Sequence, residues 1–516
     1  MAGSGGDAGE VPDQDPPCEP RRARLDYLEV CQEEMEWVRG VTEIVGQLSV
    51  GEVDCVVADL DALRCLERVE GDLIFGEGAD DLDALAQLQE VTGWLVLGAR
   101  HVELPRLVRV GRSLITGRAV ELDFPLLSRV GKDLDISSEG LTAVSFPRLD
   151  SVGGALVLPV DATTDLGFPA LEGAGDIYLE GSTLGQVSFP RLRRAGSLRF
   201  ANATDRALPD FPNLTEIAGL ALENVAVTDL HGLDAVTRAD GGFGFERNPN
   251  LESLAGLEQV TTAASIVAIE NPKLESLEAL GKIEGEIRAL VVENNASLRN
   301  LDGLEGVVAS GDRVQIEANP VLEDIDALSG LEKAVTVIVR ANPLLDELAG
   351  FRGLQQIASL ELAELDALTT TADLAALTSV EHDLVIQNCP ALRELGFLPE
   401  VGGNFAIQDL PALETLAFPR KLVMDGGNLS ISNTGLTRLE GFDQVTHLGS
   451  LNVSRNRKLE SLRNFSGLEA VSSGLSVTDN AALPACEAEW LRDRIGETNI
   501  GAVLFEHNDG SGPCVP

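Results

Sequence analysis

Aliphatic residues recur along most of the chain in two alternating patterns. Short segments such as GDLIF (71–75) alternate apolar and polar residues, which predicts strands with Leu73 and Phe75 on the core side. Leucines then follow every three residues, as at Leu251, Leu254 and Leu257. This spacing fits neither a long helix nor a continued strand, and favours short extended and 3₁₀ segments that turn a coil. We therefore predict a single-stranded parallel β-solenoid of about twenty coils of roughly 19 to 25 residues.

The turn after each strand carries a recurring phrase, as in NPNLESLAGL (248–257), NPKLESLEAL (271–280) and NRKLESLRNF (456–465). A stacked column of asparagine amides would satisfy the backbone groups that leave the ladder at the bend. The predicted column consists of Asn224, Asn248, Asn271, Asn295, Asn319, Asn342, Cys389, Asn433, Asn456 and Asn480. Leu365 and Leu410 fall in the same column and cannot make these bonds, so we expect the ladder to be irregular there.

A second version of the repeat carries Phe-Pro at the turn, as at Phe124-Pro125 and Phe146-Pro147. The two versions divide the array into residues 66–232 (FPxL-type coils) and 233–482 (NPxLxxLxGL-type coils). One unbroken solenoid is our preferred architecture. The alternative is two lobes meeting near residues 225–245, where the repeat changes.

Six of the seven cysteines gather at the two ends, and Cys389 lies alone within the repeats. Cys18, Cys31, Cys55 and Cys65 precede the repeats, and Cys486 and Cys514 follow them. We predict disulfide-bonded caps over 18–65 and 483–516, with three pairings open for the first four cysteines. Residues 18–65 have helical spacing through Leu25, Leu28 and Met35, which predicts a helical cap. Disulfides indicate an oxidising compartment, and hence a secreted or cell-surface protein.

The charge balance narrows the partners. With 83 acidic and 39 basic residues the formal net charge is −44, which argues against nucleic acid. The sequence contains no signal peptide and no apolar run long enough to cross a membrane. Residues 1–17 are rich in Gly, Asp and Pro and predict a disordered tether. This stretch resembles what remains after an export signal is removed, which would place a leader, and with it a lipid anchor, ahead of residue 1.

Nothing in the sequence predicts catalysis, a cofactor or a metal site. The five histidines are scattered, and no nucleophile, phosphate-loop or metalloprotease motif occurs. Asp133, Asp135 and Asp176 lie at outward positions, but a soluble acidic surface produces the same arrangement. Asp-Leu pairs at 58–63 and 80–85 follow the repeat spacing rather than that of a calcium loop.

The G-x-L-x-I strand, the N-P-x-L-x-x-L-x-G-L turn and the terminal segment LPACEAEWLRDRIGETNIGAVLFEHNDGSGPC resemble the receptor L-domain-like leucine-rich proteins of bacterial surfaces, notably in myxobacteria. The resemblance covers roughly residues 60–514 and also extends, more distantly, to fungal cell-wall L-domain proteins and to the ligand-binding lobes of insulin and growth-factor receptors. It implies a leucine-rich-repeat scaffold that binds ligands. Such scaffolds carry many ligands, so it does not identify the partner.

Two function classes remain, with an enzyme of the polysaccharide-active β-helix type as a third and weaker alternative. The preferred one is a non-enzymatic recognition protein that binds an extracellular protein or glycan along its sheet, and the other is a passive structural or adhesive rod. Strand alternation places an unusually apolar set of side chains on the outer face of the N-terminal coils, which is typical of a recognition surface. The candidate binding residues are Trp94, Val96, Ile115, Val157, Tyr178 and Arg199.

Overall fold

The computed structural model describes residues 18–51, 55, 57, 59–76, 82–137, 140–159, 166–181, 184, 187–396, 399–416, 424 and 426–512. The chain in this range is a parallel β-solenoid of about 19 turns. It divides into two compact units, one formed by Met1–Gly196 with Pro209–Asn213 and the other by Ser197–Leu208 with Leu214–Pro516. The predicted solenoid is therefore confirmed, and the division lies upstream of the 225–245 segment suggested by the change of repeat.

In the first unit the coils from β3 (Arg68–Glu70) onward each contribute two short strands to one parallel sheet. Register is kept from coil to coil, as in the row Leu73, Leu95, Leu114, Leu134, Leu156 and Ile177. A third side of the coils forms two small parallel sheets, β7-β10-β13 and β16-β19. The strands are β1 (Arg22–Val30), β2 (Glu43–Val50), β3 (Arg68–Glu70), β4 (Leu73–Phe75), β5 (Glu90–Val91), β6 (Leu95–Leu97), β7 (His101–Glu103), β8 (Arg109–Val110), β9 (Leu114–Thr116), β10 (Glu121–Asp123), β11 (Arg129–Val130), β12 (Leu134–Asp135), β13 (Ala143–Ser145), β14 (Ser151–Val152), β15 (Leu156–Pro159), β16 (Leu166–Gly167), β17 (Gly173–Ala174), β18 (Ile177–Glu180) and β19 (Val187–Ser188). Its 3₁₀ segments are η1 (Gln32–Val38), η2 (Asp61–Leu63) and η3 (Asp83–Leu85).

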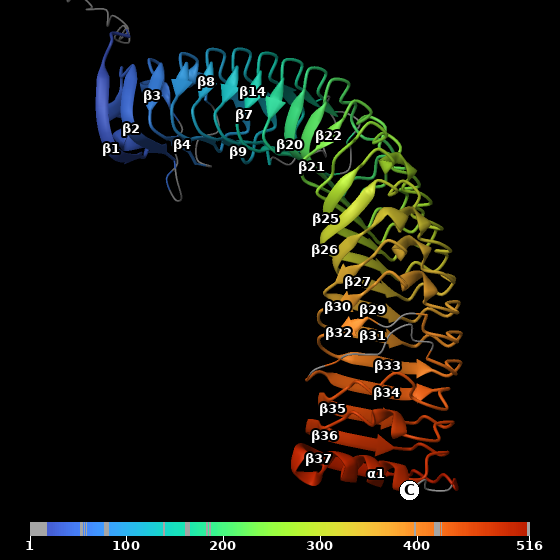
Figure 1. Ribbon diagram of the computed structural model, residues 1–516. Coiled ribbons are helices and arrows are strands. Elements are labelled where there is room, and N and C mark those ends of the chain that lie inside the picture. The colour runs from blue at the N-terminus through green and yellow to red at the C-terminus, as the bar shows by residue number, and fades with distance from the viewer. Residues whose placement is uncertain are drawn as a thin grey trace, which may run out of the picture. The chain divides into compact units, whose positions relative to one another are not determined.

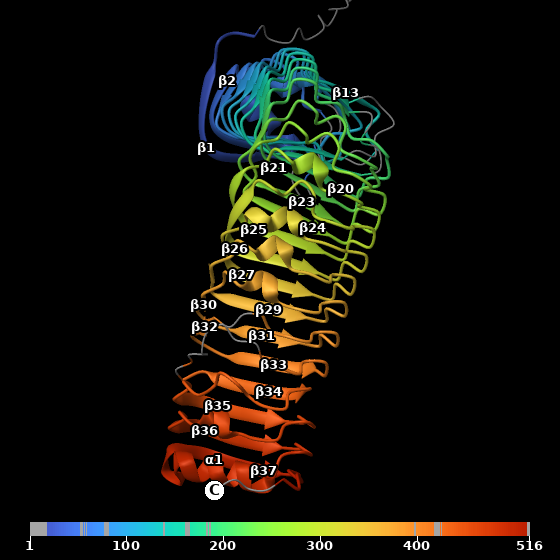
Figure 2. The same ribbon diagram turned by 45° about the vertical axis from the view of Figure 1, so that its right-hand side comes forward.

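In the second unit the strands follow one another as parallel rungs from β21 to β37, with the turns and 3₁₀ segments on the opposite side of each coil (Figures 1 and 2). The strands are β21 (Glu216–Glu223), β22 (Arg238–Ala239), β23 (Gly242–Glu246), β24 (Ser265–Ile269), β25 (Gly285–Glu293), β26 (Val307–Glu317), β27 (Lys333–Arg340), β28 (Gln356–Ile357), β29 (Ser359–Ala363), β30 (Ser379–Val380), β31 (Leu384–Gln387), β32 (Glu400–Val401), β33 (Phe405–Leu410), β34 (Asn428–Thr434), β35 (His447–Ser454), β36 (Ala470–Thr478) and β37 (Ile500–Glu506). Strand β20 (Arg194–Ala201) contains the point where the two units divide. The helical segments are η5 (Glu278–Leu280), η6 (Asp326–Gly330), η7 (Ala349–Phe351), η8 (Ala372–Leu374), η9 (Arg463–Phe465), α1 (Ala485–Ile495) and η10 (Glu497–Asn499).

The core consists of side-chain columns that repeat from coil to coil. Leu251, Leu254 and Leu257 are almost completely buried, as the three-residue spacing predicts. In the first unit the Phe-Pro phenylalanines stack on one another with ring centroids 5.1 to 5.8 Å apart, from Phe124 to Phe211. The two versions of the repeat therefore differ in what fills the same corner of the coil.

Buried asparagines of the second unit form a ladder. Each Oδ1 accepts the backbone N–H of the residue at the same place one coil earlier, as Asn319 does from Asn295 at 3.0 Å. Each Nδ2 donates to a strand carbonyl, as from Asn319 to Val292 at 3.0 Å. The asparagines joined in this way are Asn248, Asn271, Asn295, Asn319 and Asn342, and, nearer the C-terminus, Asn456, Asn480 and Asn508.

Two members of the predicted column are wrong by one residue. The backbone N–H of Val225 donates to Asn248, and that of Thr434 donates to Asn456, so Val225 and Thr434 occupy the column. Asn224 and Asn433 directly precede them with positive φ angles of 54° and 49°. Asparagine tolerates this left-handed conformation better than most residues, so the same residue type serves two neighbouring positions of the turn. Asn508 belongs to the ladder and was missed.

The predicted helical cap over 18–65 is also corrected. Residues Arg22–Val30 form strand β1, and the described helical residues of this range are the 3₁₀ segments Gln32–Val38 and Asp61–Leu63. Register shifts between Arg24 and Tyr27, so two residues of β1 face the single residue Gly46 of β2. This β-bulge adds one residue to the alternation and places Leu25 and Leu28 three apart, which imitates helical spacing.

The first four cysteines form the disulfides Cys18–Cys65 and Cys31–Cys55. Cys486 is also disulfide-bonded. Its predicted partner Cys514 lies outside the described residues, so that pairing stays a prediction. Cys389 is a free, buried cysteine.

Candidate functional site

The outward face of the first unit's sheet carries a continuous row of side chains, one from each coil. Each member is paired in register with the next and keeps part of its surface accessible. The row consists of Ile74, Val96, Ile115, Asp135, Val157 and Tyr178. Four of the six predicted binding residues lie in this row, and Asp135 is its one charged member. We call it the apolar row.

Trp94 lies beside the apolar row, two residues before Val96 on the same strand segment. Its side chain is 43% exposed. Its backbone is held in place by two hydrogen bonds to the preceding coil. The Trp94 N–H donates to Asp72 Oδ1 at 2.8 Å, and the Trp94 carbonyl accepts from the backbone N–H of Leu73 at 2.8 Å. The ring is thus presented from a fixed backbone on the open side of the sheet.

Arg199, the sixth predicted residue, belongs to the second unit. Its Nη2 donates to Glu223 Oε2 at 2.8 Å. Hydrogen bonds from Arg199 and then Arg247 hold the pKa of the Glu223 carboxyl below its ordinary value. Arg199 is therefore engaged in a surface ion-pair cluster, and we do not assign it to the apolar row.

Aspartates at the start of the outward strands have a structural role that the sequence did not reveal. Asp133 Oδ1 accepts the backbone N–H of Ala155 in the next coil at 2.9 Å, just as Asp72 accepts that of Trp94. Asp383 does the same for Asn404 in the second unit at 3.1 Å. A Cβ at Gly154 would lie 2.3 Å from Asp133 Oδ1, which explains the glycine that opens many strands. The recurring Gly-Asp spacing is the signal that could have predicted this.

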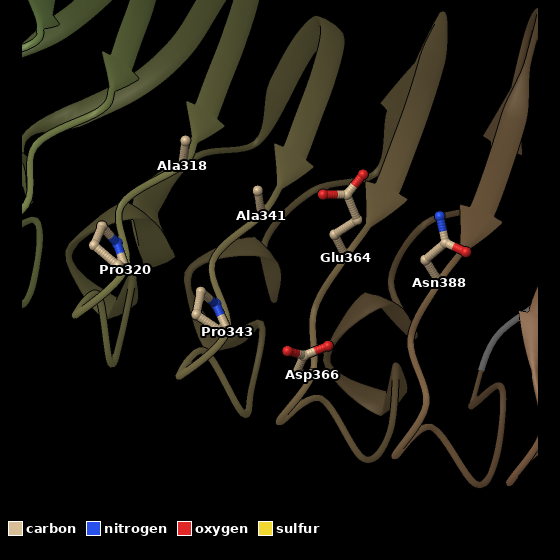
Figure 3. A pocket seen from close by; sticks show the side chains of 7 residues that line it. All are labelled: Ala318, Pro320, Ala341, Pro343, Glu364, Asp366 and Asn388. Atoms are coloured by element: carbon tan, nitrogen blue, oxygen red, sulfur yellow. The ribbon is translucent and has the colours of Figure 1, made fainter.

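A shallow hollow of about 460 Å³ lies at the corner of the second unit where strands β26, β27, β29 and β31 end. Figure 3 shows Pro320 and Pro343 at equivalent places of adjacent coils, with Glu364 and Asp366 on the following coil. Ala318 and Ala341 occupy the positive-φ position of their turns, where other coils carry longer side chains. The short alanine side chains leave a gap in this column, and the gap forms the hollow. The two carboxylates are exposed. The hollow therefore offers no enclosed environment for catalysis.

Among the described residues there is no cluster of three or more His, Cys, Asp or Glu side chains arranged to hold a metal ion. None of the described helices combines the length and the apolar composition needed to cross a membrane.

Comparisons with known proteins do not assign a family. No family model matches the chain. Sporulation-specific protein 22 of Saccharomyces cerevisiae is 28% identical over 161 residues, which is 27% of this chain, and the match spans 34% of that protein's length. Among solved structures, the TLR13–ssRNA13 complex aligns with 92% of this chain and 76% of its own at 14% identity, with a TM-score of 0.25. An internalin (inlF) from Listeria monocytogenes aligns with 85% of this chain and 86% of its own at 12% identity, with a TM-score of 0.20.

Proposed function

We propose that this protein is a non-enzymatic recognition protein, secreted or held at the cell surface, that binds an extracellular protein or glycan through the apolar row and Trp94. The observation that carries the proposal is the row itself. Aliphatic or aromatic side chains occupy five of the six places in this row, interrupted only by Asp135, in a chain whose net charge is −44. Exposed apolar surface costs solubility, and aromatic residues are enriched at binding hot spots.

Further features support the proposal. The two N-terminal disulfides suit an oxidising compartment outside the cytoplasm. The solenoid supplies a rigid, regularly spaced surface, because each coil is fixed by its neighbours. The hollow beside Glu364 and Asp366 is open at the surface, and these two exposed carboxylates lack the burial that tunes catalytic side chains.

The test is the double variant Trp94→Ala with Tyr178→Ala. We expect it to retain its circular dichroism spectrum and lose capture of an envelope component from the source cell. The matched control is Ile338→Ala with Val385→Ala, which removes half-buried side chains from the corresponding outward row of the second unit.

Intact folding with unchanged capture by the Trp94 and Tyr178 variant would place the binding surface elsewhere. A protein that captures nothing in its native form would instead fit the alternative of a passive rod. Equal losses in the two double variants would show that the effect comes from weakened folding rather than from the apolar row.

A further inference from the structure

A cluster of unneutralised basic side chains stands next to Trp94 in the first unit. The sequence motif Arg-Val-Gly-Arg/Lys occurs at residues 109–112 and again at 129–132, in adjacent coils. Arg109 and Arg129 are directly paired in the parallel ladder. The backbone N–H of Lys132 donates to the carbonyl of Arg112 at 3.0 Å, so these two side chains also leave from neighbouring rungs. We call Arg109, Arg112, Arg129 and Lys132 the basic patch.

The basic patch is contiguous with the proposed binding face. The Arg112 N–H donates to the carbonyl of Gly93 at 3.0 Å, which places Arg112 beside the residue that precedes Trp94. All four basic side chains are exposed. Trp94 and the basic patch therefore form one accessible surface within a single unit.

None of the four side chains forms an ion pair with any described residue. Two carboxylates on the same rungs, Glu90 and Asp133, have other partners. Glu90, which is paired with Arg109 in the ladder, forms a salt bridge with Arg68 at 3.5 Å. Asp133 accepts hydrogen bonds from the Ser113 hydroxyl and the Ala155 N–H. The positive charge of the patch is thus left for solvent or a ligand.

In the absence of a ligand, the four basic side chains of the patch destabilise the fold. Like charges directly opposite in a sheet are destabilising, and here they stand opposite each other twice in a chain with 83 acidic residues that could have neutralised them. In neighbouring coils the positions of Arg112 and Lys132 are occupied by Gly93 and Gly154. The repeat itself therefore does not need a basic residue there, which points to a role in binding.

We propose that the basic patch and Trp94 bind an anionic glycan, a polysaccharide with a carboxylate on successive sugar rings. Guanidinium groups pair with carboxylates in bidentate geometry, and the indole ring offers a flat face for a sugar ring. The basic side chains repeat at the strand spacing of about 4.8 Å along an open surface, which suits a regularly charged polymer. A protein ligand, in contrast, would typically bind through an apolar side chain that fills a pocket. The overall negative charge does not prevent this, because screening over about 8 Å leaves local charges dominant at physiological salt.

This inference rests on the proposed function and narrows its partner. The experiment measures binding of a fluorescently labelled oligogalacturonate to the full chain by anisotropy. The native protein is expected to bind it and not a neutral dextran. The variant Arg112→Gln with Lys132→Gln is expected to bind about tenfold more weakly, and the variant Trp94→Ala should weaken binding as well. The matched control is Arg106→Gln with Arg148→Gln, two exposed arginines of the same unit outside the patch, which should bind as the native protein does.

Absence of oligogalacturonate binding, or an equal loss in the Arg106 and Arg148 control, would overturn the proposal. So would equally tight binding of a polyglutamate of matched charge, which would assign the surface to an acidic protein segment instead. Loss of envelope capture in the Trp94 and Tyr178 variant tests the apolar row separately. Native capture that persists in the Arg112 and Lys132 variant would overturn the glycan assignment and leave the proposed function standing.

Discussion

The asparagine ladder allows a quantitative prediction at Asn319, which lies in its middle and is completely buried. The Asn319→Ala change removes an acceptor from the Asn295 N–H at 3.0 Å and a donor from the Val292 carbonyl at 3.0 Å. Both groups belong to the preceding coil. The bond from the Asn319 N–H to Asn342 Oδ1 remains, because it uses the backbone. The Glu317 carbonyl of the same coil also loses a hydrogen bond from Asn319 Nδ2 at 3.0 Å, but it still accepts the Asn294 N–H at 3.0 Å. The main damage is therefore directed to the preceding coil.

The cost follows from two buried backbone groups. An unsatisfied buried donor or acceptor costs about 1–3 kcal/mol, and the cavity left by a small polar side chain adds little. Allowing for partial relaxation, we expect a loss on the order of 2–4 kcal/mol. The matched control is Gln315→Ala in strand β26, which ends two residues before Asn319; the Gln315 amide reaches only the carboxylate of Glu317 at 3.1 Å on the accessible face. Its cost should stay below about 0.5 kcal/mol.

Amide hydrogen exchange gives a local readout. A solenoid of 516 residues need not unfold in one step, so a single melting temperature would mix several events. In Asn319→Ala the Asn295 amide should exchange about 30- to 1000-fold faster than in the native protein, which is the rate change that corresponds to the expected loss of free energy. In Gln315→Ala it should exchange at the native rate. Native protection of Asn295 in Asn319→Ala, or an equal effect of Gln315→Ala, would refute the ladder as a source of stability.

Two further predictions concern the buried cysteine and the C-terminal cap. Burial raises the pKa of the Cys389 thiol to about 11 from an ordinary value of 9.0, so the unfolded chain loses the proton first. The stability that this group contributes is intact below pH 9 and is lost as the pH rises through 11, by about 3 kcal/mol in total. Urea unfolding of the native protein and of Cys389→Ala at pH 8 and pH 11 should therefore show a larger loss of stability in the native protein. An equal loss of stability in the two proteins would contradict the prediction. Glu487 is buried and accepts hydrogen bonds from Ser461 Oγ, Leu462 N and Arg463 Nε. Glu487→Gln should lower the midpoint of the denaturant unfolding transition, followed by Trp490 fluorescence, by the equivalent of about 1–3 kcal/mol. Glu489→Gln on the exposed side of the same helix should leave this midpoint unchanged. Equal midpoints in the two variants would count against the hydrogen-bond network of the cap.

The repeating parts of the fold could be predicted from sequence because every coil repeats the same physical requirement. Alternation in GDLIF, the three-residue leucine spacing and the buried asparagines each recur often enough to separate signal from chance. The N-terminal cap occurs once, so its pattern had no second copy to check it. There the bulge opposite Gly46 shifted Leu25 and Leu28 into helical spacing, and a strand was taken for a helix.

The register of the asparagines could not be fixed from sequence at every coil. Adjacent positions of the turn both accept asparagine, one because it is buried and needs an amide, the other because its φ is positive. Asn294 and Asn295 show the two roles side by side. Where only one asparagine is present, as at Asn224, the sequence does not say which role it fills.

The candidate site was harder to predict than the core. Core positions must be apolar and recur at a fixed spacing, whereas the outward residues of a solenoid are not restricted in this way. Some of them proved structural, such as Asp72 and Asp133, whose carboxylates hold the next coil. Whole-chain charge also concealed the basic patch, since a sum of −44 says nothing about four arginine and lysine side chains on two adjacent rungs. The useful comparison is between coils. Residues that depart from their column without serving the fold, as Arg112 and Lys132 do between Gly93 and Gly154, are where function should be sought.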